Sequence, residues 1–232
     1  HIAGHLSQAE NIYQQILQNH PNQPNALHLL GVLARQMDKS DIAVDLITRA
    51  LAIKPDLTEA HNNLGIVLRG LGKLNEAVAC YHKALDLRPD YAEAHNNLGM
   101  AFCSLGKLDD GVASYQEALR FKTDYFEAHN NLGNALKDLG KFKESEASYQ
   151  RAIALKPDFA LAHYNFGNLL RELSKPEAAV AGYHKAIAIN PAYAEMHNNL
   201  GSALKDLGKF EESETSFQRA ITLNPAYAEA HY

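Results

Sequence analysis

One asparagine recurs every 34 residues along this chain, in each case directly before an apolar residue. The column consists of Asn63, Asn97, Asn131, Asn165 and Asn199, and Asn134 and Asn168 lie three residues after two of its members. A carboxamide offers both hydrogen-bond donors and an acceptor, which are the two functions that a peptide backbone presents. Packing alone gives no reason for an amide to recur beside a core leucine. The column therefore predicts a surface that binds an extended peptide.

The column could also arise without peptide binding. Each amide could cap or bridge neighbouring helices, or the column could reflect duplication of one repeat. A second column directly precedes the first and is interrupted by Tyr164; it consists of Asn62, Asn96, Asn130 and Asn198. We expect one column to face a groove and the other to bridge to a neighbouring repeat, and we favour the Asn63 column for the groove. Basic residues six places after members of the Asn63 column could add contacts: Arg69, Lys137, Arg171 and Lys205.

A histidine column raises the question of metal binding; it consists of His61, His95, His129, His163 and His197. Neighbouring helices pack about 8–10 Å apart, whereas each ligand of a zinc ion lies about 2.0–2.1 Å from it. No Cys or His three or four residues away supplies a second ligand. We expect these histidines to be packing residues with a polar edge, and we predict neither a metal nor a cofactor.

No residue set predicts catalysis. Each His, Ser or Asp that could be recruited lies in a repeated column or a turn, so no unique pair of nucleophile and base stands out. Cys80 and Cys103 are the only cysteines, which excludes a disulfide framework, and we expect both to be buried, unreactive thiols. The sequence predicts no catalytic residue, and this chain is not expected to be an enzyme.

The elements that position these columns follow from the same period. Four further columns share it: a glycine (Gly31, Gly65, Gly99, Gly133, Gly167, Gly201), a proline (from Pro21 to Pro225, with Thr123 in one place), an alanine (from Ala50 to Ala220) and a tyrosine (Tyr81, Tyr115, Tyr149, Tyr183, continued by Phe217). A fixed period of about 20–50 residues indicates a solenoid. A solenoid is a linear stack of repeats without a single central core.

Each repeat is predicted to be a helical hairpin. In residues 58–91, an apolar face built on Ala60, Leu64, Val67, Leu68 and Leu71 defines a first helix, and one built on Leu74, Ala77, Val78, Tyr81, Ala84 and Leu85 defines a second. Gly72 and Lys73 form the turn, and Ser174 with Pro176 is expected to begin a helix where one repeat lacks the turn glycine. Capping boxes are expected at Asp56 with Glu59, Asp90 with Glu93 and Asp124 with Glu127. Gly65 lies within a helix at a cost of about 1 kcal/mol, which we attribute to close packing of the two helices.

The repeats are expected to fill the whole chain as one solenoid. Six full repeats are predicted at residues 24–57, 58–91, 92–125, 126–159, 160–193 and 194–227, preceded by a partial repeat at 1–23 and followed by the start of another at 228–232. Residues 3–6 align with the turn at 71–74, so one helix is expected from about residue 5 to residue 20. These unfinished ends lead us to expect that the chain is part of a longer protein.

The composition argues against two classes of partner, nucleic acids and membranes. The formal net charge is −5 and no basic cluster is present, which argues against binding to nucleic acid. No apolar stretch is long enough to cross a membrane and no signal peptide opens the chain. We expect a cytoplasmic protein without membrane or nucleic-acid partners.

The motif Leu64-Gly65, Ala77, Tyr81, Ala84 and Pro89 resembles the signature of the tetratricopeptide repeat family, and all six full repeats match that signature with substitutions such as Thr123 in place of the proline. The resemblance implies an all-α, right-handed superhelical solenoid. The wording AEAHNNLG is most similar to bacterial repeats that precede O-GlcNAc-transferase-like domains, in which the matching asparagines line the concave surface and hold extended peptide. It implies that role for the Asn63 column and a part as the substrate-recognition arm of a larger glycosyltransferase.

Three further functions are weighed against peptide binding. Leu29 occupies the groove position in the first repeat, so the more apolar N-terminal region and the uncapped ends could make the chain an oligomerisation module. A chaperone adaptor that grips a C-terminal carboxylate would need Lys or Arg where this chain has Asn and Glu. An RNA reader is disfavoured by the negative charge.

Overall fold

The computed structural model describes residues 2–225, and this part of the chain consists of thirteen helices without a strand. A single helix, α1 (Ile2–Asn19), precedes six antiparallel hairpins. The hairpins are α2 (Pro24–Gln36) with α3 (Ser40–Ile53), α4 (Thr58–Gly70) with α5 (Leu74–Leu87), α6 (Ala92–Ser104) with α7 (Leu108–Phe121), α8 (Phe126–Asp138) with α9 (Phe142–Leu155), α10 (Ala160–Glu172) with α11 (Pro176–Ile189), and α12 (Ala194–Asp206) with α13 (Phe210–Leu223). The predicted all-α solenoid is confirmed, and the helix start predicted at 228–232 lies outside the described residues.

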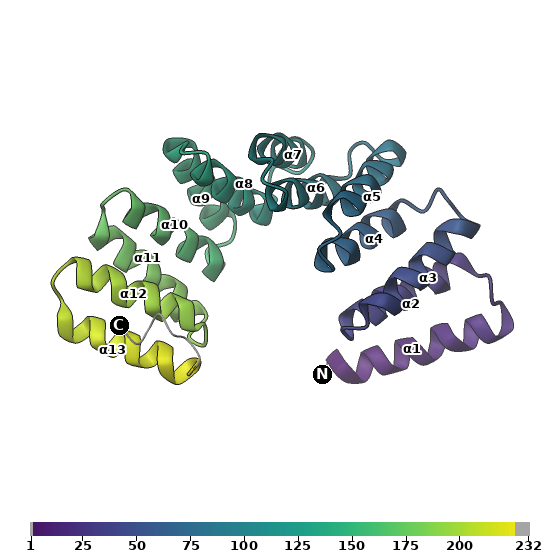
Figure 1. Cartoon of the computed structure of the whole chain (residues 1–232), viewed down its shortest axis with the longest axis horizontal. Coiled ribbons are helices and arrows are strands. Elements are labelled where there is room, and N and C mark those ends of the chain that lie inside the picture. Colours follow the sequence, from purple (N-terminus) through teal and green to yellow (C-terminus); the bar gives the residue numbers. More distant parts are fainter. Residues whose placement is uncertain (1, 226–232) are drawn as a thin grey trace. The chain divides into compact units, whose positions relative to one another are not determined.

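The chain divides into two compact units, residues 1–123 with α1–α7 and residues 124–232 with α8–α13 (Figure 1). Within each unit, every helix packs against the next one along the chain. The first helices of successive hairpins, here called A helices, also contact one another: α2, α4 and α6 in the first unit, and α8, α10 and α12 in the second. We call the surface that they form in each unit the A-helix face, and the second helices of the hairpins the B helices.

The predicted apolar faces form the core of each unit. In the first unit, Leu64, Val67 and Leu68 of α4 pack with Ala77 and Tyr81 of α5 in one buried cluster. The second unit has a corresponding cluster built on α10, α11 and α12. Leu71, predicted to belong to the first face, is instead the exposed C-cap residue of α4.

Five of the six hairpins are closed by an aromatic ring that lies on a helix glycine, and in the first hairpin the side chain of Ile47 takes this place on Gly31. A methyl group on Gly133 would meet Cε1 of Tyr149 at 2.7 Å, and one on Gly65 would meet Cε1 of Tyr81 at 2.5 Å. The same contact recurs between Gly201 and Phe217, with 2.8 Å to the ring. These separations are shorter than van der Waals contact, so only a residue without a side chain allows the ring to seat. The close packing inferred from Gly65 is confirmed.

We predict that Gly133→Ala lowers the free energy of unfolding by about 1–3 kcal/mol, because the added methyl group overlaps the ring of Tyr149. Urea unfolding followed by circular dichroism measures the change. Gly70→Ala is the matched control, since a methyl group there meets nothing within 4 Å and removes a helical glycine. It should leave the stability equal or slightly higher. Equal stabilities of the two variants would contradict the packing role.

The turn inside each hairpin needs one residue in the left-handed conformation. Gly72, Gly106, Gly140 and Gly208 take φ values of 73–75°, whereas Asp38 and Ser174 hold the same position at 58° and 57°. The expectation that Ser174 begins the next helix is therefore wrong. The N-cap residue of α11 is Lys175, which makes no capping hydrogen bond through its side chain, while Pro176 does take the first turn of the helix as predicted.

Ser174→Gly should raise the free energy of unfolding by about 1 kcal/mol, because a residue with a Cβ is strained at positive φ. The reverse change, Gly140→Ser, should lower the free energy of unfolding by a similar amount. Backbone strain is the only cause there, because an added Cβ meets no other atom within 4 Å. Thermal unfolding of both variants measures the two effects. A fall in the melting temperature of Ser174→Gly would show that the positive φ of Ser174 does not destabilise the chain.

The expected capping boxes are also wrong. The N-cap residues are Leu57, Tyr91 and Tyr125, none of which makes a side-chain capping hydrogen bond. The glutamates lie at the second helical position, one residue too early to reach back to the N-cap. Glu59 instead accepts a hydrogen bond from Arg88, and Glu93 accepts one from Lys122 at 3.3 Å. The acidic residues thus join the start of one hairpin to the end of its second helix.

The turn expected at residues 3–6 is absent as well, since α1 already runs from Ile2. Gly4 continues the helix there, at the usual cost of about 1 kcal/mol for a glycine in a helix.

Candidate functional site

The Asn63 column lies half-buried on the A-helix face, and its side chains bond to the preceding repeat. In the first unit, Nδ2 of Asn97 donates to Oδ1 of Asn62 at 3.0 Å. Asn63 itself lies with Nδ2 2.9 Å from Nε2 of His28, which occupies the equivalent place one repeat earlier. Asn63 and Asn97 thus each reach back to the residue that precedes the column in the neighbouring A helix.

The second unit repeats this pattern with one substitution. Nδ2 of Asn165 donates to Oδ1 of Asn130 at 3.0 Å. Where Tyr164 interrupts the preceding column, its hydroxyl accepts from Nδ2 of Asn199 at 2.8 Å and donates to Glu195 at 2.7 Å. The phenol therefore takes over the function of the missing asparagine, and the row of bonds between repeats continues.

The two asparagine columns differ in burial. Asn62, Asn96, Asn130 and Asn198 are 1–6% exposed, whereas the Asn63 column is half-buried throughout. Within the second unit, Nδ2 of Asn130 also lies 3.4 Å from Oδ1 of Asn131. The helix-bridging alternative is thus present in the folded chain. Binding of a peptide by these seven asparagines stays a prediction.

Asn134 and Asn168 have a partner that sequence reasoning missed. The hydroxyl of Tyr149 donates to Oδ1 of Asn134 at 2.6 Å, and that of Tyr183 donates to Oδ1 of Asn168 at 2.8 Å. Oδ1 of Asn168 also accepts from Asn199 at 3.0 Å. These bonds satisfy the buried tyrosine hydroxyls and hold both carboxamides in place. The constant separation of 15 residues between Asn and Tyr was the signal that could have revealed them.

The second unit carries a polar hollow of about 510 Å³ on the A-helix face. It is lined by Lys137, Asn168, Arg171, Glu172, Tyr183 and Asp206. Two basic residues predicted to supply contacts are already paired, since Nε of Arg171 lies 2.9 Å from Asp206 and Nζ of Lys137 lies 3.0 Å from Asp138. Charge is therefore balanced inside this hollow, and its amide and hydroxyl groups can take up an uncharged polar group such as a peptide unit.

The histidine column fixes the entry of the chain into each A helix. Nε2 of His61, His95, His163 and His197 lies 2.8–3.0 Å from the backbone oxygen of the proline six residues earlier. A carbonyl oxygen only accepts, so Nε2 carries the proton in each ring. The expected polar edge of these packing residues is thus a hydrogen bond to the connecting loop.

His28 is buried next to Asn63, and burial lowers its pKa below the usual 6.5, with the charge of Glu59 acting in the opposite direction. Above that pH the imidazole is neutral in both the folded and the unfolded chain. As the pH falls below it, the unfolded chain takes up the proton more readily, so folding stability decreases.

His28→Asn restores the residue that most other repeats carry here, and we predict that it removes this loss. As the pH falls from about 7.5 to about 5.5, the unfolding free energy of the variant should increase relative to that of the original chain. Urea titrations at both pH values measure it, and the other eleven histidines contribute equally to the two chains. A difference that is independent of pH would contradict the prediction.

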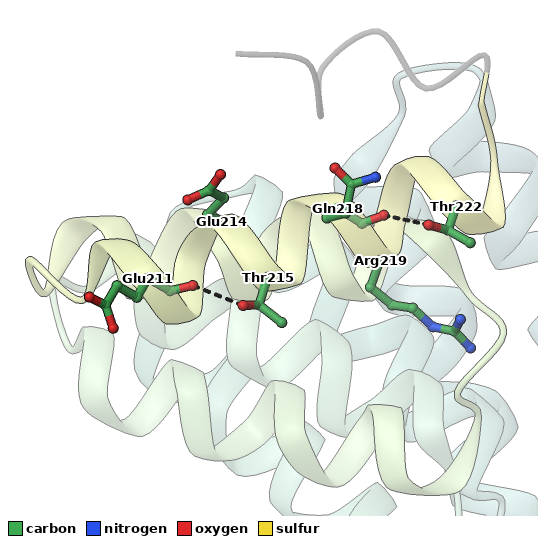
Figure 2. Close-up of a pocket in the computed structure, with 6 residues that line it drawn as sticks. All are labelled: Glu211, Glu214, Thr215, Gln218, Arg219 and Thr222. Atoms are coloured by element: carbon green, nitrogen blue, oxygen red, sulfur yellow. Dashed lines mark hydrogen bonds between the residues drawn. The ribbon is translucent and has the colours of Figure 1, made fainter.

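A second hollow, of about 590 Å³, runs along α13 (Figure 2). Its six lining residues all come from this one helix, and two of its hydroxyls are already satisfied: Thr215 donates to the backbone oxygen of Glu211 at 2.9 Å, and Thr222 to that of Gln218 at 2.8 Å. We assign no function to it.

The remaining candidates are the two cysteines, metal sites and membrane-spanning helices. Cys80 and Cys103 are thiols outside any disulfide and are half-buried rather than fully buried, and burial raises the pKa of the Cys80 thiol to about 11. Among the described residues, no group of three or more His, Cys, Asp or Glu side chains could hold a metal ion. None of the described helices combines the length and apolar character needed to cross a membrane.

The hairpins, the ring-on-glycine contact and the stacked A helices define a helical-repeat solenoid. Family comparison matches the chain to "TPR repeat" at residues 67–102, 99–140, 133–172 and 167–208, and to "Tetratricopeptide repeat" at residues 194–227. The chain belongs to the tetratricopeptide repeat family, as its motif indicated.

Solved structures of similar fold include a chain of the APC/C hetero-tetramer Cut9-Hcn1, with 16% identity and a TM-score of 0.85 over 99% of this chain and 45% of that one. MamA has 26% identity and a TM-score of 0.62 over 74% of this chain and 94% of that one. YrrB, described as a TPR protein with an unusual peptide-binding site, has 22% identity and a TM-score of 0.60 over 80% and 95% of the two chains. The chain thus spans less than half of the first of these. No curated protein sequence matches it.

Proposed function

We propose that this chain is a scaffold that binds proteins or peptides in extended conformation on its A-helix face. The observation that carries the proposal is the row of half-exposed amides oriented by bonds to the preceding repeat, as in Asn97 with Asn62 and Asn165 with Asn130. In Asn97 and Asn165 this bond uses one amide hydrogen and leaves a second hydrogen and the carbonyl oxygen of the same side chain. A rigid amide of this kind binds a peptide unit without first losing rotational freedom.

The spacing of the column suits an extended chain. Neighbouring helices pack about 8–10 Å apart, and an extended peptide advances about 3.3 Å per residue. One amide per repeat would then contact about every third peptide residue. The likeness in fold to YrrB, a TPR protein with an unusual peptide-binding site, supports such a function.

A finer part of the proposal concerns the protein to which this chain belongs. The resemblance of the AEAHNNLG segments to the repeats of O-GlcNAc-transferase-like proteins supports a role as the substrate-recognition arm of a glycosyltransferase. This part rests on that resemblance alone, and the chain itself is proposed to act without catalysis.

Self-association is the second candidate function. Each of the first three helices exposes an apolar side chain: Ile12 of α1 is 55% exposed, Leu29 of α2 39% and Ile42 of α3 51%. Light scattering over a concentration series tests it: a monomer at every concentration removes this candidate, whereas a dimer that Leu29→Glu dissociates supports it.

Peptide binding is tested by selecting displayed random peptides on the chain and measuring their Kd by fluorescence anisotropy. We expect Asn97→Ala/Asn131→Ala/Asn165→Ala to raise the Kd about tenfold or more, because each lost hydrogen bond is worth about 0.5–1.5 kcal/mol. Far-ultraviolet circular dichroism should show unchanged helicity.

Two control variants separate binding from folding. Asn75→Ala/Gln116→Ala changes exposed amides of B helices and should leave the Kd unchanged. Asn62→Ala/Asn130→Ala breaks the same bonds between repeats but keeps the half-exposed amides, so it should cost less affinity. Equal Kd values for the triple variant and the original chain, or failure to select any peptide, would refute the proposal.

A further inference from the structure

A groove of about 580 Å³ lies on the other side of the second unit, between the B helices α9 and α11. Its floor is formed by Phe166 and Leu170 of α10, and its walls include Ile153 of α9 and Ala178 and Ala181 of α11. Phe166 and Leu170 follow His163 at intervals of three and four residues, so they share one face of α10. Asn165 and Asn168 lie on the opposite face, and the groove is therefore separate from the proposed peptide-binding surface.

The groove coincides with departures from the repeat pattern. Phe166 stands where the other full repeats carry leucine, and Glu146 stands where four of them carry valine (Val44, Val78, Val112 and Val180). Val44, Val78 and Val180 pack against the cores of their units, whereas Glu146 accepts a hydrogen bond from Gln150 at 3.2 Å. Gly182 adds no side chain where the other repeats carry Leu, Cys or Ser. An apolar floor is thus left open between the two helices.

The α11 side of the groove carries two positive charges, Lys175 and Lys185, and the α9 side contributes one carboxylate, Glu146. In the next repeat, Lys209, which corresponds to Lys175, forms an ion pair with Glu212 at 3.6 Å. In the second repeat, Lys83, which corresponds to Lys185, lies 4.0 Å from Asp86. Both acidic partners are replaced by alanine here, at Ala178 and Ala188. Neither Lys175 nor Lys185 has an ion-pair partner within the described part of the chain.

We propose that this groove is a second docking site, which takes an apolar side chain of a partner protein segment that carries acidic residues beside it. The floor supplies the apolar contact, which drives binding by removing apolar surface from water. The ammonium groups of Lys175 and Lys185 are not neutralised within α11, because Ala178 and Ala188 replace the glutamate and aspartate of other repeats. Their positive charge favours a partner segment that carries acidic residues. Because the groove is open along the two helices, its occupant is a chain segment.

The proposal is tested with a synthetic peptide of about a dozen residues that carries Leu and Phe flanked by Glu. Its binding to the full chain is followed by NMR of labelled Ile and Ala methyl groups. We expect shifts at Ile153, Ala154, Ala178 and Ala181, and a Kd that rises with salt, because exposed ion pairs are screened. A peptide with Lys in place of Glu should bind about tenfold more weakly.

Ala178→Glu/Ala188→Asp is the decisive variant, since it restores residue types that other repeats hold at these places and is compatible with the fold. It should raise the Kd about tenfold, whereas Ala79→Glu/Ala113→Glu, which adds the same charge at exposed positions of α5 and α7, should not. The proposal is overturned if no shift occurs up to about 1 mM peptide, if the shifts lie on the A helices instead, or if the restoring variant binds equally well. Peptide binding through the asparagine column is unaffected by any of these results.

Discussion

A large side chain packed on a helix glycine is the contact on which each hairpin depends; it is an aromatic ring in five hairpins and Ile47 in the first. It brings the two helices of a repeat together so closely that no side chain fits at Gly65, Gly133 or Gly201. A glycine inside a helix costs about 1 kcal/mol, and the buried ring offsets that cost through the apolar surface that it removes from water. Because a solenoid has only neighbour contacts, the geometry of every A helix relative to its partner follows from this local packing.

A second set of interactions builds on that geometry. Once the A helices stand side by side, an amide on one helix meets the residue one place earlier in the preceding repeat, as for Asn97 with Asn62 and Asn165 with Asn130. The row tolerates substitution where the chemistry is kept: Tyr164 accepts from Asn199 as an asparagine would, and His28 meets Asn63 at the start. The same bonds that stabilise the stack orient the half-exposed amides proposed to bind peptide.

Differences between repeats are as informative as their common features. Ser174 keeps the turn at the cost of positive φ, which shows that the turn geometry is required even without glycine. Ala178 and Ala188 remove acidic partners that equivalent lysines keep elsewhere, and Glu146 leaves a valine position of the core. Glu146 and Ala178 both line one groove, together with Phe166 and Gly182, so several departures from the repeat pattern share one surface.

The sequence by itself determined the repeat and the hairpin, because apolar spacing and a fixed period dictate which residues of one hairpin must be buried. It also led us to expect different surroundings for the two adjacent asparagine columns, since adjacent residues of a helix face different ways. The tertiary structure decided the partners: Tyr149 with Asn134, His61 with the oxygen of Pro55, and Glu59 with Arg88 instead of a helix cap. The period states which residues are equivalent, but the bonding partner depends on how far one helix is displaced against the next, and only the packing of whole hairpins sets that displacement.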